Sequence, residues 1–480
     1  MSNNLQLKLL TPEEIGNIYE KCVEFLSTKG VQVNHPQALN DLNKAGAQVD
    51  FSNKRVRFPR DIIETSLRTV PGEVLMAGQS EDRDFIMPHP NGLFYTRNNS
   101  GARTYVEPST NNARNVVLAD VAEWGQLGEV LDEINICAQP FPQDVPGETA
   151  DIHAVKTLFE NTTKHVFVQV YSFASIEYLF ELALVMAGSK EALRKRPLVS
   201  MGPCSVPPFV FNDLHIEQIV QSCRYGVPMF LCPLPGAGAT SPVTITGTVL
   251  QSGIEILAML IMTQILQPGV PVIAFPIYLV VDMITGILSG ATTEAVIGNA
   301  ASLQFIKEAF HIPTHTWGFG TDSFIPDGQA MSESILSGLV AALAGGDLIT
   351  GAGRLNASAV MSPVKLVTDN KLVKIVKRLK SGIKVDDDTL AWQEILNTEP
   401  GGHYLELAHT LKHCREALRA GLSVTQPRDT WLAEGGKDLH ARMVEEYSEI
   451  KKKLHPVELP EEVKRELDRI VRTADKRLAR

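Results

Sequence analysis

From about residue 93, short apolar runs alternate along the chain with longer stretches whose apolar residues recur at helical spacing. The runs lie at 93–96, 134–138, 165–172, 197–201, 227–232, 270–275, 313–318 and 347–350. Helical spacing is clearest at 121–131, 175–186, 213–225, 249–266, 294–310 and 330–344. Strands that alternate with helices indicate a parallel sheet. Eight such units favour a closed (β/α)8 barrel, the TIM barrel, over an open doubly wound sheet.

The pattern differs at both ends of the chain. Residues 1–90 open with Thr11, Pro12 and Glu14, a capping-box spacing at the start of a helix, and continue with a β-like stretch at 49–58. After residue 362 the chain becomes charged and helical. We therefore predict an α/β protein with three parts: an N-terminal α+β extension (1–90), a catalytic barrel (91–362) and a helical C-terminal region (363–480).

Glycine, proline and polar residues cluster directly after several predicted strands, at 202–209, 233–242, 318–327 and 351–358. In a barrel these loops gather at the C-terminal ends of the strands, where active sites form. We expect the functional site there. The glycine-rich loops match neither a P-loop nor a dinucleotide-binding fingerprint.

Charge and composition limit the classes of partner that the protein is expected to bind. Net charge is −10, from 45 basic and 55 acidic residues, which favours neither nucleic acid nor an anionic membrane. The apolar stretches 249–266 and 270–289 contain Glu255 and Asp282, so we interpret them as buried barrel elements and not as membrane spans. Six scattered cysteines without a CxxC pair, and a start unlike an export signal, predict a cytoplasmic protein.

Three long segments, 238–274, 282–301 and 321–355, together carry a family resemblance. The run SPVTITG (241–247), followed by QPGVPV (267–272), is the most distinctive part. The chain resembles the trimethylamine methyltransferase family over nearly its whole length, most strongly at 230–365. The resemblance implies a (β/α)8 enzyme of methylamine and one-carbon metabolism. Such an enzyme passes a methyl group to a corrinoid (cobalamin) that a separate corrinoid-binding protein carries.

The founding members of that family carry pyrrolysine in a loop after a late strand, near the stretch 321–329 of this chain. No such residue occurs here, and the equivalent position lies near Phe324. The resemblance is therefore to the pyrrolysine-free branch, which implies transfer from glycine betaine with release of dimethylglycine. A quaternary nitrogen already has a neutral amine as its leaving group. Proline betaine, carnitine and trimethylamine remain alternative substrates.

Aromatic side chains near strand ends are candidates for holding a quaternary ammonium group, because aromatic faces attract cations. Aromatic residues also fill barrel cores routinely, so each candidate has a purely structural alternative. Trp317 and Tyr95 rank first because they lie in polar, loop-proximal contexts. The complete set is Tyr95, Tyr171, Phe209, Phe275, Tyr278, Trp317, Phe319 and Phe324.

A carboxylate on the substrate needs a hydrogen-bond donor. Arg354, just after the last predicted strand, can grip it with a bidentate fork. Arg97 and His315 are rivals, with Asn99 as a neutral donor; surface salt bridges and a barrel-core histidine are the alternatives. Asp322 either orients a loop, balances the substrate cation or caps a helix.

Other residues of the chain suggest alternative classes of function. His409 and His413 have helical zinc-ligand spacing beside Cys414, but a packed or solvated helix face is the favoured interpretation, and we expect no zinc. A Schiff-base lyase would need a lysine at a strand end, and the predicted strands contain none. A non-catalytic quaternary-amine binding protein would share the same pocket. We expect the corrinoid protein to dock on loops 235–242 and 318–328. We also expect the protein to form a homo-oligomer.

Overall fold

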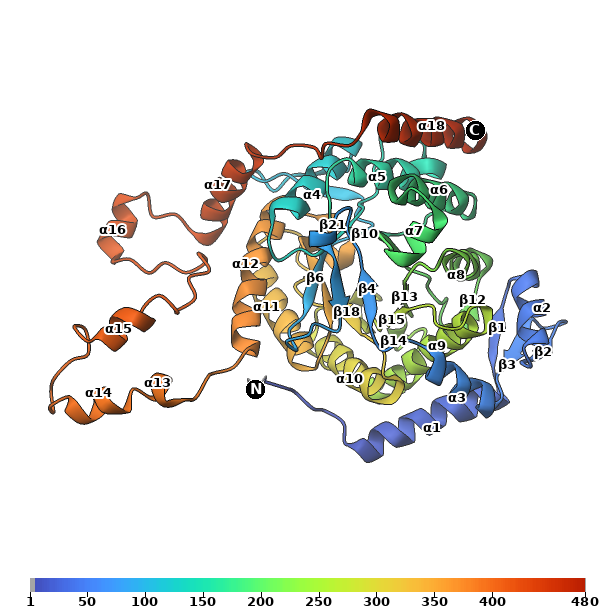
Figure 1. Ribbon diagram of the computed structural model, residues 1–480, viewed down its shortest axis with the longest axis horizontal. Helices are drawn as coiled ribbons and strands as arrows, with labels where there is room; N and C mark the ends of the chain where they lie inside the picture. Colours follow the sequence, from blue (N-terminus) through green and yellow to red (C-terminus); the bar gives the residue numbers. More distant parts are fainter. Residues whose placement is uncertain (1–4, 480) are drawn as a thin grey trace.

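A computed structural model describes residues 5–479, and at its centre eight parallel strands close into a barrel (Figure 1). In order around the barrel, which is also their order in the chain, the strands are β6 (Tyr95–Asn98), β9 (Ile136–Ala138), β10 (His165–Val168), β11 (Val199–Met201), β13 (Met229–Leu231), β15 (Val272–Ala274), β18 (His315–Trp317) and β19 (Leu348–Ala352). A bridge between Ala274 and Thr314 joins β15 to the start of β18 and closes the ring. The predicted (β/α)8 barrel is confirmed.

A helix follows each strand and covers the outside of the barrel. These helices are α4 (Leu118–Val130), α5 (Ala150–Phe159), α6 (Ile176–Ala187), α8 (Asp213–Tyr225), α9 (Ile245–Leu266), α10 (Thr293–Phe310), α11 (Gly328–Leu343) and α12 (Pro363–Lys380). Six of them coincide with the stretches of helical spacing, and α8 does so residue for residue. The sequence pattern missed α5, and α12 serves as the eighth barrel helix by packing on β19 and α11.

Helix α9 is the longest helix among the described residues. It is long and apolar enough to span a membrane, yet 83% of its most apolar window is buried inside the protein. It lies between the barrel and α1 (Pro12–Thr28), whose buried stripe includes Cys22, Val23 and Leu26. The interpretation of 249–266 as a buried barrel helix is therefore confirmed.

The N-terminal extension packs against one side and one end of the barrel. Helix α1 begins with the predicted capping box, in which Glu14 N donates to Thr11 Oγ1 at 3.3 Å and Thr11 N donates to Glu14 Oε2 at 2.8 Å. Strand β1 (Val31–Val33) pairs with β12 (Val210–Phe211), a short strand in the loop that follows β11. A hairpin of β4 (Val74–Met76) and β5 (Phe85–Met87) covers the N-terminal end of the barrel.

Beyond α12 the chain departs from the barrel over residues 381–437 and then returns (Figure 1). Helix α17 (Leu439–Lys451) packs on α12, and Tyr447 Oη donates to Glu123 of α4 at 2.5 Å. Helix α18 (Glu461–Leu478) lies across α5 and α6, where His153 and Lys156 pair with Asp475 and Asp468, both at 3.0 Å. The C-terminal region is helical, as its charge and spacing indicated.

Candidate substrate pocket

A cavity of about 200 Å³ lies at the C-terminal end of the barrel, inside the ring of loops that follow the strands. Its floor and walls combine aromatic rings, two arginines, two cysteines and small residues. The side chains and backbone that line it are Arg97, Asn99, Ser100, Phe167, Gln169, Gly202, Cys204, Cys232, Leu234, Phe275, Ile277, Trp317, Thr350, Gly351, Arg354 and Ser358. Among the described residues, no carboxylate side chain lines this cavity.

Arg97, the third residue of β6, is 2% exposed and points into the barrel. Its guanidinium carbon lies 4.1 Å from the ring centroid of Phe167 and 5.9 Å from that of Phe275. Within residues 5–479, its Nε and Nη1 atoms have no hydrogen-bond partner. Burial lowers the pKa of Arg97 to about 9, because no carboxylate offsets the loss of water around the charge. Arg97 is therefore a buried cation without a counter-ion, and a bound anion would stabilise it.

Arg354 belongs to β20 (Arg354–Leu355), just after the last barrel strand, and stacks at 4.1 Å on the ring of Trp317. Gly320 allows this approach, since a Cβ there would collide with the guanidinium. Burial lowers the pKa of Arg354 to about 10, while Asp322 and two further carboxylates, Glu333 and Asp369, oppose that shift. Arg354 thus differs from Arg97 in having acids nearby, but its Nε and Nη1 atoms likewise have no hydrogen-bond partner within the described residues.

Asp322 ties together the loops that follow β15 and β18. Its carboxylate accepts hydrogen bonds from the backbone N–H groups of Gly290 and Ala291, at 3.1 and 2.9 Å. Glu333 of α11 in turn accepts from Asp322 N at 2.9 Å and from Thr321 Oγ1 at 2.5 Å. The N-cap of α11 is Asp327, so Asp322 has no capping role there and holds the loops beside Trp317 instead.

A buried ion pair on α12 fixes the loops that carry Trp317 and Arg354. Lys365 and Asp369 are both buried, with their charged atoms 2.6 Å apart. Lys365 Nζ also donates to the carbonyl of Phe319 at 2.7 Å, and Asp369 accepts from Gly353 N at 2.7 Å. One pair therefore holds the backbone after β18 and the backbone after β19.

His315 lies at the start of β18, fully buried, and stacks on Phe275 with ring centroids 3.7 Å apart. Neither ring nitrogen has a hydrogen-bond partner within the described chain. Burial and the nearby charge of Arg97 hold the pKa of His315 well below its ordinary value. The imidazole is therefore neutral at physiological pH.

The structure brings five of the thirteen candidate residues together around the cavity: Arg97, Asn99, Phe275, Trp317 and Arg354. His315 supports the ring of Phe275, and Asp322 supports the rim. The remaining six candidates do not line the cavity.

Tyr95 lies at the opposite end of the barrel, because it starts β6; it packs on Phe85 and His89 at centroid distances of 4.2 and 4.9 Å. Tyr171 follows β10 but packs on Phe141 at 4.7 Å. Phe209 packs on Phe25 of α1 at 4.3 Å, so it belongs to the contact with the N-terminal extension.

Tyr278 and Phe319 each pack over a helix glycine, Gly298 of α10 and Gly338 of α11, and so fill the layer between barrel and helices. Phe324, near the expected pyrrolysine position, is 69% exposed on the loop after β18. Aromatic character near a strand end thus identified two cavity residues but could not tell inward from outward positions.

Phe167 and Gln169 line the cavity but were missed. They alternate with Val166 and Val168, which face the helices in the main core cluster. The period of two in the run HVFVQV was therefore the available signal. Cys204 and Cys232, on neighbouring strand extensions, were also missed, because they become neighbours only when β11 pairs with β13.

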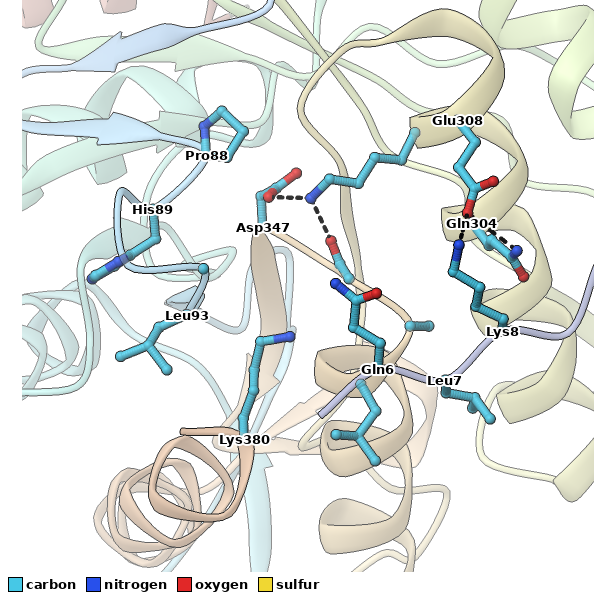
Figure 2. A pocket seen from close by; sticks show the side chains of 15 residues that line it. Gln6, Leu7, Lys8, Pro88, His89, Leu93, Gln304, Glu308, Asp347 and Lys380 are labelled. Atoms are coloured by element: carbon cyan, nitrogen blue, oxygen red, sulfur yellow. Dashed lines mark hydrogen bonds and ion pairs between the residues drawn. The ribbon is translucent and has the colours of Figure 1, made fainter. Parts of the chain in front are cut away.

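A second, larger cavity of about 310 Å³ lies at the N-terminal end of the barrel, near Asp347 at the foot of β19 (Figure 2). Its charges are already paired. Lys307 Nζ donates to Asp347 at 2.6 Å and to the carbonyl of Gly345 at 2.8 Å, while Lys380 Nζ donates to the carbonyl of Ala342 at 2.5 Å. The smaller C-terminal cavity, lined by two buried arginines with unpartnered nitrogens, is the better candidate for the site.

The histidine pair noted in the sequence lies in the segment that leaves the barrel. Ligand atoms of His409, His413 and Asp388 lie within 4.8 Å of one another, a set that could hold a metal ion. Lys412 Nζ already bonds both carboxylate oxygens of Asp388, at 2.6 and 2.7 Å. The expectation that these residues bind no zinc stays a prediction.

Fold and cavity together define a (β/α)8 protein whose C-terminal pocket suits a small organic substrate with an anionic group. Comparison with known proteins then places the chain: the model of the trimethylamine methyltransferase (MTTB) family matches residues 1–478, so the protein belongs to that family. The predicted family is confirmed, and with it a methyltransferase.

Relatives of known name cover nearly the whole chain. Trimethylamine methyltransferase MttB of Desulfitobacterium hafniense (strain DSM 10664 / DCB-2) is 29% identical over 96% of this chain and 92% of its own. Glycine betaine methyltransferase of D. hafniense (strain Y51) is 25% identical over 89% and 88%. The crystal structure of Methanosarcina barkeri monomethylamine methyltransferase has a TM-score of 0.54 and 10% identity over 94% and 90%, a likeness of fold alone.

Proposed function

We propose that this protein transfers a methyl group from glycine betaine to the Co(I) corrinoid of a partner protein and releases dimethylglycine. The family supports methyl transfer, and one relative is named for glycine betaine. The observation that carries the choice of substrate is Arg97, a buried cation without a counter-ion in the wall of the pocket.

Trimethylamine fits that pocket poorly. Methyl transfer requires a quaternary or protonated nitrogen, and two like charges 4 Å apart near a protein surface repel by about 4 kcal/mol. Two guanidiniums line the cavity, and the described residues place no carboxylate in its wall. A betaine carries its own anion. Its carboxylate can pair with Arg97 while its trimethylammonium group remains neutralised within the same molecule.

The pocket also favours one orientation of a betaine. Arg97 comes from within a strand, whereas Arg354 and Trp317 come from a strand end or the loop beyond it. A carboxylate held by Arg97 therefore lies deep, and the methyl groups face the mouth. The rings of Phe275 and Trp317 line the space between, where each favourable aromatic face contributes about 0.5–2 kcal/mol to holding a cation.

A bound corrinoid would supply the nucleophilic Co(I) that accepts the methyl group. The residues of this chain need only hold, aim and dehydrate the substrate, and tight positioning can contribute about 7–11 kcal/mol. The leaving dimethylglycine departs as a neutral amine, so no proton transfer is needed. His315 stacks on Phe275 and does not itself line the cavity, so it is not placed to act as a base on the substrate.

We propose that the corrinoid protein docks at the mouth of the barrel. Exposed apolar side chains gather on the loops that follow β13, β15 and β18: Val243, Met283, Ile284, Ile287, Leu288 and Phe324. These loops surround the cavity and include the stretch 318–328 expected from the sequence. A reducing compartment, the cytoplasm, is the proposed location.

The test is incubation of the protein with Co(I) cobalamin and a panel of amines, followed by the absorbance of methylcobalamin. Glycine betaine should yield methylcobalamin and one equivalent of dimethylglycine, with proline betaine and carnitine as the next candidates. Turnover of trimethylamine but of no betaine would refute the proposed substrate. Tight binding of betaine that is never demethylated, even with corrinoid proteins supplied, would identify a binding protein instead.

A further inference from the structure

Residues 381–437, which we call the arm, project from the body of the protein between α12 and α17 (Figure 1). The arm contains four short helices: α13 (Asp387–Leu390), α14 (Trp392–Asn397), α15 (Ala408–His413) and α16 (Arg428–Ala433). None of its side chains is buried. Helices of four to six residues are not stable in water by themselves. The arm meets the body at Leu422, which packs on the core and whose carbonyl accepts from Arg442 Nη2 at 2.7 Å. The large apolar side chains of α13, α14 and α15 remain exposed in the protomer, so these helices need a further surface.

The exposed side chains of the arm are unusually apolar. Twelve of the thirty exposed large apolar side chains among residues 5–479 lie in it. They are Ile383, Val385, Leu390, Trp392, Ile395, Leu396, Tyr404, Leu405, Leu411, Leu418, Val424 and Leu432. At roughly 100 Å² for a fully exposed large apolar side chain, and with exposures of 44–80%, they expose on the order of 700 Å² of apolar surface in total.

Polar contacts within the arm give it a definite local shape without covering this surface. Asp388 accepts from Lys412 at 2.6 Å, and its backbone carbonyl lies 2.9 Å from His409 Nε2. These contacts join α13 to α15 across more than twenty residues. The arm is thus locally organised, while its apolar side chains face outward.

We propose that the arm packs on a second copy of this chain, and that two copies exchange arms reciprocally. The area agrees with this partner, because a stable interface takes about 800 Å² from each side and permanent interfaces are the more apolar ones. A second copy is always present at equal concentration, and two-fold homodimers are the commonest soluble oligomers. The arm also shares no residue with the cavity or with the loops at its mouth, where a corrinoid carrier has to arrive and leave.

The first test is the mass of the full chain in solution, by light scattering after size exclusion. At micromolar concentration the protein should have at least twice the 52.6 kDa mass of one chain. Leu405→Ser together with Leu411→Ser, at positions 80% and 76% exposed, should raise the dissociation constant at least 100-fold. Phe51→Ser, which removes a 50% exposed apolar side chain from the N-terminal extension, should leave the constant unchanged.

A loss of folding cannot imitate this result, since far-UV and near-UV circular dichroism of the doubly substituted protein should remain native: neither leucine is buried in the protomer. Wild-type chain that is monomeric at 10 µM would overturn the proposal, and so would an oligomer that the two substitutions leave intact. An arm that binds only an added corrinoid protein would assign the surface to that partner and overturn it too.

The second test locates the contact. Cys414 is an exposed cysteine within the arm, so a benzophenone–maleimide attached to it can photo-crosslink whatever the arm touches. The expected product is a covalent dimer whose cross-link joins the arm to the body of another chain, absent from Cys414→Ser. Cross-links confined to one chain would contradict arm exchange.

Discussion

Replacing Arg97 by methionine should separate stability from binding. In the free protein Arg97 is 2% exposed, has two unpartnered nitrogens and has no acid beside it. Replacement even of a buried ion pair by apolar side chains of similar volume is often neutral or stabilising, by up to about 4 kcal/mol, and a buried charge without a counter-ion lacks the attraction that offsets its desolvation. We therefore expect Arg97→Met to unfold at a higher temperature than wild type when no ligand is present.

The same substitution should remove the partner of the substrate carboxylate. Truncating one member of a buried charge pair costs about 2–5 kcal/mol of binding, which is a 30- to 5,000-fold weaker affinity. Titration calorimetry with glycine betaine measures this loss. Thermal unfolding at 100 times the wild-type dissociation constant gives a second readout, because wild type should gain about 2.7 kcal/mol of stability and Arg97→Met almost none.

Arg354→Met is the matched control, because Asp322, Glu333 and Asp369 lie near enough to that guanidinium to favour its charged form. Its removal takes a favourable positive charge away from those acids, so the melting temperature should fall instead of rise. If Arg97→Met binds glycine betaine as tightly as wild type, the assignment of the carboxylate site is refuted. If both variants are destabilised alike, the distinction between an uncompensated and a compensated arginine is refuted.

Three further predictions concern the rest of the site. Trp317→Ala should raise the KM for betaine about 2- to 30-fold, the loss of one cation-binding face; an unchanged KM would remove Trp317 from the site. Lys365→Met and Asp369→Asn should each lower the free energy of unfolding by about 3–5 kcal/mol, because each leaves the other buried charge without its partner. The double variant should lose clearly less than the sum of the two. Additive losses in denaturant titrations would contradict the pairing. The pKa of His315 is depressed in the folded state and is about 6.5 in the unfolded state. Below pH 6.5 the unfolded chain therefore takes up a proton that the folded protein does not. The free energy of unfolding should then fall on acidification by up to about 1.4 kcal/mol per pH unit. In His315→Phe that slope should be smaller, and an identical pH profile would show that His315 is already charged.

The barrel was predictable because its strands are short apolar runs with regular helical stretches between them. Helix α8 begins at Asp213 and ends at Tyr225, followed by Gly226 at φ 73°, a stop signal that the sequence displays. Helix α5 was missed because two buried polar residues, Asp151 and Thr157, interrupt its apolar pattern. Burial of polar residues, satisfied by distant partners, cannot be seen in a local window.

The site was predictable only in part, for a related reason. Loop and strand-end positions identified Arg97, Trp317 and Arg354, because all βα loops of a barrel meet on one face. Aromatic character did not reveal direction: Tyr95 starts its strand and faces the opposite end, while Phe209 turns toward α1. The contrast between Arg97 and Arg354 depends on acids from separate loops and helices, which only the folded structure brings together.

The central claim is that the pocket selects a quaternary amine by its carboxylate. Competition between glycine betaine and choline tests it most directly, since choline keeps the trimethylammonium group and replaces the carboxylate by a neutral alcohol. Calorimetric titration of the wild-type protein should show glycine betaine binding at least 30-fold more tightly than choline, and Arg97→Met should abolish that preference. Equal affinity for the two ligands in wild type, or tighter binding of choline, would contradict the account.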